Sequence, residues 1–110
     1  MQYLVSMEAS GNYTLTKAKE VSHFLEHTVI PSLESCVSLQ LQSKIIAGGM
    51  ISGSRSSIFI LESSSHEDVS RLLMNLPIWG STNVTITPIE DFASRLALHQ
   101  ETVDRIKGAD

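Results

Sequence analysis

Apolar and polar residues follow two different periods along this chain, and the changes of period divide it into segments. Residues 2–8 alternate between apolar and polar side chains, which predicts a half-buried strand. From Thr14 or Thr16, either of which can cap a helix with its hydroxyl, apolar or small residues recur every three or four positions to about Gln42. This spacing predicts a long helix, and Pro31 inside it should kink or restart that helix because proline lacks the backbone N–H.

The middle of the chain predicts a hairpin. Residues 44–52 and 56–62 are rich in apolar and β-branched residues, and Gly53-Ser54 between them indicates a turn. Gly48-Gly49 within the first of these strands indicates a bulge or a close approach of another part of the backbone.

The rest of the chain predicts a helix, a strand and another helix. Ser65 opens a helix with acidic residues in its first turn, where they favour the helix dipole, and this helix stops at Pro77. Residues 82–87 alternate as a strand that ends at Pro88, and a final helix follows from Glu90. Its apolar stripe is Phe92, Leu96, His99, Val103 and Ile106.

The first six segments follow the order strand, helix, strand, strand, helix, strand. This βαββαβ order predicts the ferredoxin-like α+β fold, a four-stranded antiparallel sheet with two helices on one face. The extra C-terminal helix, about residues 90–107, comes after it. Because no linker, repeat or block of like charge divides the chain, we expect a single domain over residues 1–110.

Large apolar side chains are predicted on both faces of this sheet. Ile58 and Ile60 point away from Phe59 and Leu61, and Leu4 points away from its apolar neighbours. In the strand 44–52 the expected faces are Ile45, Ala47 and Ile51 against Ile46 and Met50. Two helices cover only one face, so the other face of a monomer should be polar. We therefore expect a homodimer packed sheet on sheet, the alternative being a C-terminal helix folded back over the open face.

Composition narrows the classes of function. The chain has a net charge of −4 and a single cysteine, Cys36. An acidic chain without a basic stripe is not typical of a nucleic-acid-binding protein or of a basic membrane-surface helix. No apolar stretch approaches the ~20 residues of a membrane span, and one cysteine excludes an internal disulfide framework. Since the N-terminus carries no signal-peptide pattern, we expect a cytoplasmic protein with no nucleic-acid or membrane partner.

Several groups of residues resemble a known family. They are Leu76-Pro77-Ile78-Trp79, Ile86-Thr87-Pro88-Ile89, Phe92 and Arg95, and upstream Ile30-Pro31-Ser32-Leu33-Glu34, Gly48-Gly49 and Gly53-Ser54-Arg55. Over roughly residues 1–95 the chain is similar to muconolactone isomerase-like proteins of the dimeric α+β barrel superfamily. The resemblance implies a homodimer or larger ring, in which the C-terminal helix packs on a neighbouring subunit.

The same resemblance implies a chemistry without metal or cofactor. The family's named enzyme moves a proton on an unsaturated lactone in a pocket between the first helix and the sheet. Glu26 is the match to the acidic residue that is the candidate proton carrier there, and Tyr3 would orient the substrate or donate a hydrogen bond. The chain departs from the family at Leu4, where true isomerases carry a histidine, and at Gly80, which replaces a proline.

A helical projection places small and apolar residues against the sheet. They are Ala18, Val21, Ser22, Leu25, Thr28, Val29, Ser32 and Cys36. A pocket here would be apolar with a few hydroxyls, which suits a small apolar ligand contacted by Ser22 and Thr28, whereas the alternative is an ordinary packed core. Arg55 either binds a ligand carboxylate or stays solvated, and Trp79 either shapes the pocket mouth or packs in the core.

One motif has a metal-binding counterpart. The segment from His23 to His27 fits H-x-x-E-H, an inverted zinc-protease signature. The projection places both histidines opposite the sheet and Glu26 on the flank. We therefore interpret the histidines as a solvated face and expect no metal. Glu26 is either a surface glutamate or, if partly buried, a group that moves a proton near neutral pH.

Three functions remain open from the sequence. The first is a cofactor-independent isomerase or cyclase that acts on a small apolar or unsaturated substrate. The second is a non-catalytic ligand-binding or assembly protein, which the uncharged pocket face favours. The third is a cofactor-independent monooxygenase, which the scarcity of inward-facing aromatic and histidine residues disfavours.

Overall fold

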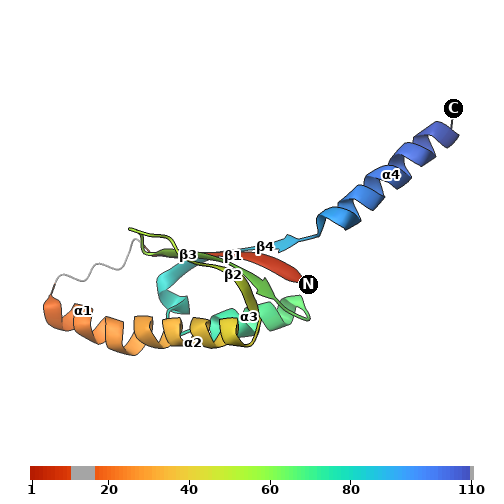
Figure 1. The fold of residues 1–110 in the computed structure, drawn as a ribbon. Helices are drawn as coiled ribbons and strands as arrows, with labels where there is room; N and C mark the ends of the chain where they lie inside the picture. Colours follow the sequence, from red (N-terminus) through yellow and green to blue (C-terminus); the bar gives the residue numbers. More distant parts are fainter. Residues whose placement is uncertain (11–16, 110) are drawn as a thin grey trace.

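The structure is a computed structural model that describes residues 1–10 and 17–109. The predicted caps Thr14 and Thr16 lie outside the described residues. Four antiparallel strands form one sheet in the order β2-β3-β1-β4, and α2 and α3 cover one of its faces (Figure 1). This is the ferredoxin-like α+β arrangement predicted from the sequence. The elements are β1 (Gln2–Ala9), α1 (Ala18–Phe24), α2 (Ile30–Leu41), β2 (Ile45–Met50), β3 (Ser56–Glu62), α3 (His66–Met74), β4 (Thr82–Ile89) and α4 (Phe92–Gly108).

The core lies between the two central strands and the helices. The predicted alternation of β1 is confirmed, because Tyr3, Val5 and Met7 are buried while their neighbours on the strand are not. In β3, Phe59 and Leu61 lie opposite Val5 and Tyr3 and are equally buried. The described core is completed by Ile45, Val69, Leu73 and Leu76.

The α3 helix begins as predicted. The Asp68 backbone N–H donates a hydrogen bond of 3.1 Å to the Ser65 hydroxyl, which satisfies one of the free donors of the first turn. The helix ends at Met74, before Pro77. In contrast, β4 does not end at Pro88 but continues to Ile89. Pro88 is tolerated because β4 is an edge strand, where a missing N–H on the outer side breaks no ladder bond.

Pro31 interrupts the long helix, as predicted. It stands in the first turn of α2, and Leu25–Val29 before it form a π-helical segment in which the Ile30 N–H donates to the Leu25 carbonyl five residues back. A π-turn holds one more residue than an α-turn, so the projection that assumes 100° per residue fails across it. The predicted contact of Val21 and Leu25 with the sheet is also wrong: their exposed fractions are 37% and 44%, and no residue of α1 is buried. Figure 1 shows α1 extending past the end of the sheet.

The strand β2 contains both irregularities that its glycines indicated. The register shifts between Ile45, which lies opposite Leu61, and Ala47, which lies opposite Ile60. This bulge moves Ala47 to the face opposite Ile45, so the predicted grouping of these two residues is wrong. Gly48 has φ +107°, and a Cβ there would lie 2.2 Å from the Ile58 carbonyl oxygen. Only glycine allows this close approach.

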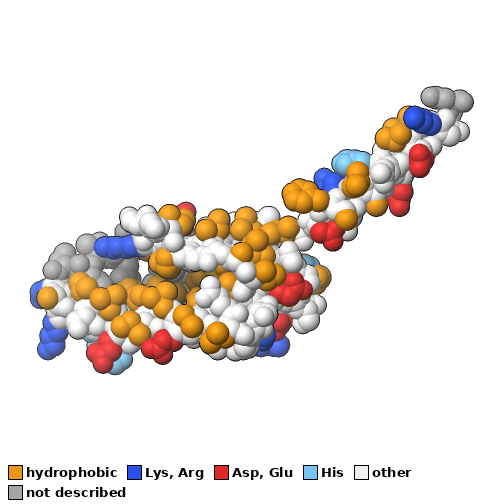
Figure 2. Space-filling view, in the orientation of Figure 1, with side chains coloured by type: hydrophobic (Ala, Val, Ile, Leu, Met, Phe, Trp, Pro, Cys, Tyr) orange, Lys and Arg blue, Asp and Glu red, His pale blue; other side chains and the backbone are white. Residues whose placement is uncertain are grey.

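No helix formed by the described residues covers the second face of the sheet. Ile58 and Ile60 lie opposite Ser6 and Leu4 on this face, as predicted, and Ile58 and Ile89 are exposed. Figure 2 shows hydrophobic atoms gathered along this uncovered side of the sheet. We call this surface, made of Leu4, Ala47, Ile58, Ile60 and Ile89, the open face.

The C-terminal helix α4 projects away from the sheet (Figure 1). None of its described residues is buried, and Phe92 is 95% exposed. The alternative that the helix folds back over the open face is therefore wrong for this chain. The radius of gyration is 19.0 Å, whereas a compact domain of this length has about 13 Å.

Candidate functional site

A cavity of about 390 Å³ lies between α2 and the sheet, at the end next to the β2–β3 hairpin. Figure 2 shows the surface hollowed between the long helix and the sheet, with hydrophobic side chains on both sides. The apolar lining consists of Met7, Val29, Leu33, Cys36, Val37, Ile45, Met50, Phe59, Leu76 and Ile78, together with the backbone of Gly48 and Gly49. Its size falls within the range of small-molecule sites.

Gly48 contributes backbone to the cavity wall. It lies opposite Phe59, on the face of β2 that is turned toward α2. The same residue lets the two strands approach closely. The helix side contributes Leu33, Cys36 and Val37, which are only partly covered in the single chain.

The polar groups in the lining fall into two sets. Ser32 and Thr82 are already bonded: the Ser32 hydroxyl donates to the Thr28 carbonyl at 2.7 Å and accepts from the Ile78 N–H at 3.0 Å, and the Thr82 hydroxyl donates to the Trp79 carbonyl at 3.1 Å. The side chains of the second set, Gln40, Arg55 and Ser57, have no hydrogen bond or ion pair to any described residue.

Two titratable side chains line the cavity, Cys36 and Arg55. Partial burial raises the pKa of the Cys36 thiol, so this group is neutral at neutral pH. A neutral thiol is a weak nucleophile. No carboxylate or histidine belongs to the lining formed by the described residues.

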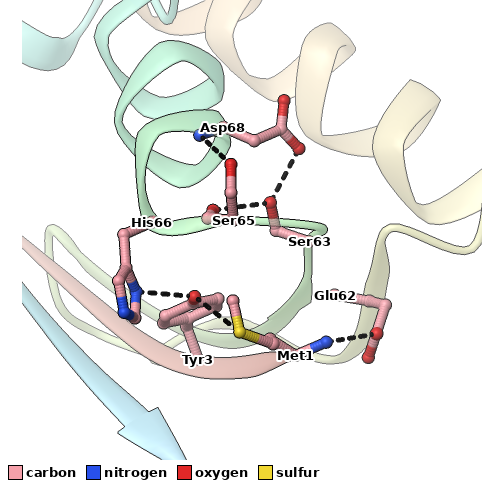
Figure 3. Close-up of polar contacts among 7 residues, drawn as sticks. All are labelled: Met1, Tyr3, Glu62, Ser63, Ser65, His66 and Asp68. Atoms are coloured by element: carbon pink, nitrogen blue, oxygen red, sulfur yellow. Dashed lines mark hydrogen bonds and ion pairs between the residues drawn. The ribbon is translucent and has the colours of Figure 1, made fainter.

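Tyr3, a predicted catalytic residue, lies at the opposite end of β1 from the cavity. It is four residues from Met7, about 13 Å along the strand. Its hydroxyl is 2.7 Å from Nδ1 of His66 at the start of α3, and the rings meet edge to face (Figure 3). Ser63 and Asp68 form a neighbouring pair, with 2.7 Å between the Ser63 hydroxyl and the carboxylate.

Glu26, the predicted proton carrier, lies in the π-helical segment with its side chain 73% exposed, and it does not line the cavity. His23 and His27 are also exposed, and their ring centroids are 4.4 Å apart. No group of three or more histidine, cysteine, aspartate or glutamate residues within 1–10 and 17–109 is arranged to hold a metal ion.

Arg55 is the one predicted ligand contact that lines the cavity. Ser22 is exposed on α1, and Thr28 contributes its carbonyl to Ser32. Trp79 is half-buried and packs against the core beside Ile78, which does line the cavity. The structure therefore does not gather the predicted residues into one site.

Ser57 and Gln40 are cavity residues that the sequence reasoning missed. A signal for Ser57 was present, because it stands two residues before Phe59 in the predicted strand 56–62 and two-residue spacing places both on one face. Gln40 gave no such signal, since α2 carries serine and glutamine on several sides.

Fold and cavity together define a ferredoxin-like α+β protein with an apolar helix–sheet pocket. No protein-family model matches the chain, and no curated protein matches its sequence. Among solved structures, it is similar to the crystal structure of muconolactone isomerase, with a TM-score of 0.66 and 18% identity over 83% of this chain and 90% of that chain. The resemblance seen in the sequence is thus confirmed at the level of the fold. No helix in the described part of the chain is long and apolar enough to cross a membrane.

Proposed function

We propose that this protein binds a small, mainly apolar ligand in the cavity between α2 and the sheet. The observation that carries the proposal is the cavity itself, about 390 Å³ of space whose lining is mostly apolar. The cavity is open to solvent, because the lining side chains Leu33, Val37 and Met50 are exposed. A ligand that covers them would remove apolar surface from water, which is favourable. The unbonded side chains of Arg55 and Ser57 at the hairpin end would orient the ligand.

The absence of an acid or base from the described lining favours binding over catalysis. Proton transfer needs a donor or acceptor within hydrogen-bonding distance of the reacting atom. Cys36, the titratable group on the helix side, has a raised pKa and is a poor base at neutral pH.

A cofactor-independent isomerase or cyclase is the second candidate. The similarity to muconolactone isomerase favours it. In this proposal Glu26 moves the proton and Tyr3 orients an unsaturated substrate, with Ser22, Thr28, Arg55 and Trp79 around it. Of these residues only Arg55 lines the cavity of the single chain, and Tyr3 lies about 13 Å along β1 from it. This candidate therefore needs a neighbouring subunit or a shift of the π-helical segment to bring exposed Glu26 and the other groups to the substrate.

The proposed assembly is a homodimer or a larger homo-oligomer. The open face and the apolar stripe of α4 expose Ile58, Ile89, Phe92, Leu96 and Ile106 in the single chain. Burying a large apolar side chain contributes about 1.5–3 kcal/mol, so a second copy that covers these surfaces would be strongly stabilised. We propose that α4 packs on a neighbouring subunit.

A cavity-filling variant tests the binding proposal. Purified protein is titrated with a panel of arylalkanoic acids and unsaturated lactones by ligand-observed NMR and calorimetry. We expect binding by the wild type, loss of at least tenfold in affinity in Cys36→Phe, and no change in Ser38→Phe, which is exposed on the same helix. Circular dichroism verifies folding, and Val37→Phe replaces the first variant if that one does not fold. No binding by the wild type would contradict the proposal.

Turnover separates the two candidates. The bound lactones are incubated in D2O and followed by proton NMR for isomerisation or deuterium incorporation. A binding protein leaves the ligand unchanged. Turnover that Glu26→Gln abolishes would favour the enzyme, whereas turnover unaffected by Glu26→Gln would remove this residue as the base.

A further inference from the structure

We infer that the ligand of the cavity is an amphipathic carboxylate, whose anionic group is held by Arg55 and Ser57 and whose apolar body lies against Phe59, Leu76 and Ile78. This inference rests on the proposed function and adds the class of ligand. It is carried by the order in which charged, polar and apolar side chains follow each other along one face of β3 and its hairpin.

Ser57 and Phe59 are two residues apart in β3 and share one face of the strand, and Arg55 precedes the strand in the hairpin. Ser57 lies opposite Met7 and Phe59 opposite Val5, both buried on the helix-covered face. All three residues line the cavity. A ligand lying along this face therefore meets a cation first, then a hydroxyl, and then an aromatic ring.

Arg55 is the only charged residue in the lining formed by the described residues. Its guanidinium has no ion pair or hydrogen bond to any of them. Glu8, on the adjacent strand, lies opposite Ser56 and is thus on the other face of the sheet. An unneutralised arginine beside an apolar cavity, in a chain of net charge −4, attracts an anion rather than a cation.

The groups that remain unbonded at this end have the chemistry of a carboxylate site. A guanidinium donates two parallel hydrogen bonds to one carboxylate, and the Ser57 hydroxyl can donate a third. Away from Arg55 the described lining offers no charge, and its hydroxyls are bonded: Ser32 to Ile78 and a backbone carbonyl, and Thr82 to a backbone carbonyl. Gln40, near the end of α2, is the remaining unbonded polar side chain there. Against Phe59, Leu76 and Ile78 an apolar group fits without leaving a polar atom unpaired.

A matched pair of probes tests the inference. Calorimetric titrations compare 4-phenylbutanoate with the uncharged 4-phenylbutanamide on the wild type, on Arg55→Gln and on Arg71→Gln, an exposed arginine of α3 outside the cavity lining. We expect the wild type and Arg71→Gln to bind the acid at least tenfold more tightly than the amide. In Arg55→Gln the two probes should bind equally, at the affinity of the amide.

Two results would overturn the inference in distinguishable ways. Equal binding of acid and amide by the wild type, with both lost in Cys36→Phe, would leave the binding function intact and remove the carboxylate anchor. A preference for the acid that survives in Arg55→Gln would also remove Arg55 from the site. Failure of both probes to bind the wild type would contradict the proposed function and this inference together.

Discussion

At the scale of single residues, Gly48 is the position where the surrounding backbone leaves no room for a side chain. A Cβ at this residue would lie 2.2 Å from the Ile58 carbonyl oxygen and 2.5 Å from the Phe59 Cα, with φ at +107°. Backbone atoms of a paired strand cannot move away from such a contact without breaking the ladder.

We predict that Gly48→Ala lowers the free energy of unfolding by at least about 2 kcal/mol, because strain of this kind costs about 1–3 kcal/mol before the clash is added. Urea denaturation followed by circular dichroism measures the change. Gly49→Ala is the control, since a Cβ there meets nothing within 4 Å, and it should stay within about 0.5 kcal/mol of the wild type. Equal effects of the two variants would contradict this account.

Ser32 ties α2 to the segment after α3. Its side chain is buried, and its hydroxyl accepts from the Ile78 N–H while donating to the Thr28 carbonyl. We predict that Ser32→Ala costs about 1–3 kcal/mol, because it leaves the Ile78 N–H without its partner. Ser35→Ala, which removes only a bond to the Pro31 carbonyl within the same helical region, should cost clearly less. Thermal and urea unfolding of both variants provide the comparison, and a larger loss for Ser35→Ala would refute it.

At the scale of elements, α4 depends on its own cap because none of its described residues is buried. The Ser94 N–H donates a 2.7 Å hydrogen bond to the Asp91 carboxylate, which lowers the pKa of that carboxyl group. A lowered pKa in the folded state stabilises the helix fully above about pH 4, the ordinary range of aspartate. The contribution is lost as the pH falls through the lowered pKa.

We therefore predict that the first turn of α4 frays in acid. The measurement is the amide proton shift of Ser94 by NMR as a function of pH. Asp91→Ala should remove the downfield shift at every pH. Asp91→Asn keeps a capping oxygen that does not titrate, so the same signal should stay constant through the acid range. An identical titration of Ser94 in Asp91→Asn would show that another group is responsible.

Elements in which buried residues recur at a regular spacing from end to end could be predicted from the sequence. The burial of Tyr3 and Val5 in β1, of Phe59 in β3 and of Val69 in α3 follows the two-residue and helical spacings directly. The predictions failed where one extra residue enters an element. The π-helical segment before Pro31 and the bulge before Ala47 each shift the phase, and the glycines and the proline that marked them did not give the size of the shift.

The candidate site was predictable only in part for the same reason. A cavity between the first helix and the sheet was expected, but its floor depends on Gly48 facing the helix, which follows from the bulge and not from simple alternation. Arg55 lines the cavity because the hairpin bend that precedes β3 lies next to it. Tyr3 and His66 meet only because β1 and the start of α3 are adjacent in space, a contact between residues far apart in the chain.

At the scale of the whole molecule, the chain is extended, with dimensions of 72 × 28 × 25 Å. We predict that light scattering coupled to size exclusion gives at least twice the chain mass of 12.1 kDa at micromolar concentration. Ile60→Lys, on the open face, should shift the protein toward the monomer by burying a charge in the interface. Ser70→Lys, exposed on α3, is the control and should leave the mass unchanged. A single-chain mass for the wild type would contradict the proposed assembly.

The two edge strands of the sheet, β4 and β2, determine whether further molecules can add to it by strand pairing. An edge strand with free N–H and C=O groups invites further strands and, with them, fibrous aggregation. In this protein β4 carries Pro88, which has no N–H to offer, and β2 is twisted by the bulge between Ile45 and Ala47. Both edges are thus poor templates for strand addition, while the apolar groups lie on a face and on a helix. In the proposed homo-oligomer, association would therefore use the faces and the helix and not the strand edges, which disfavours amyloid-like growth.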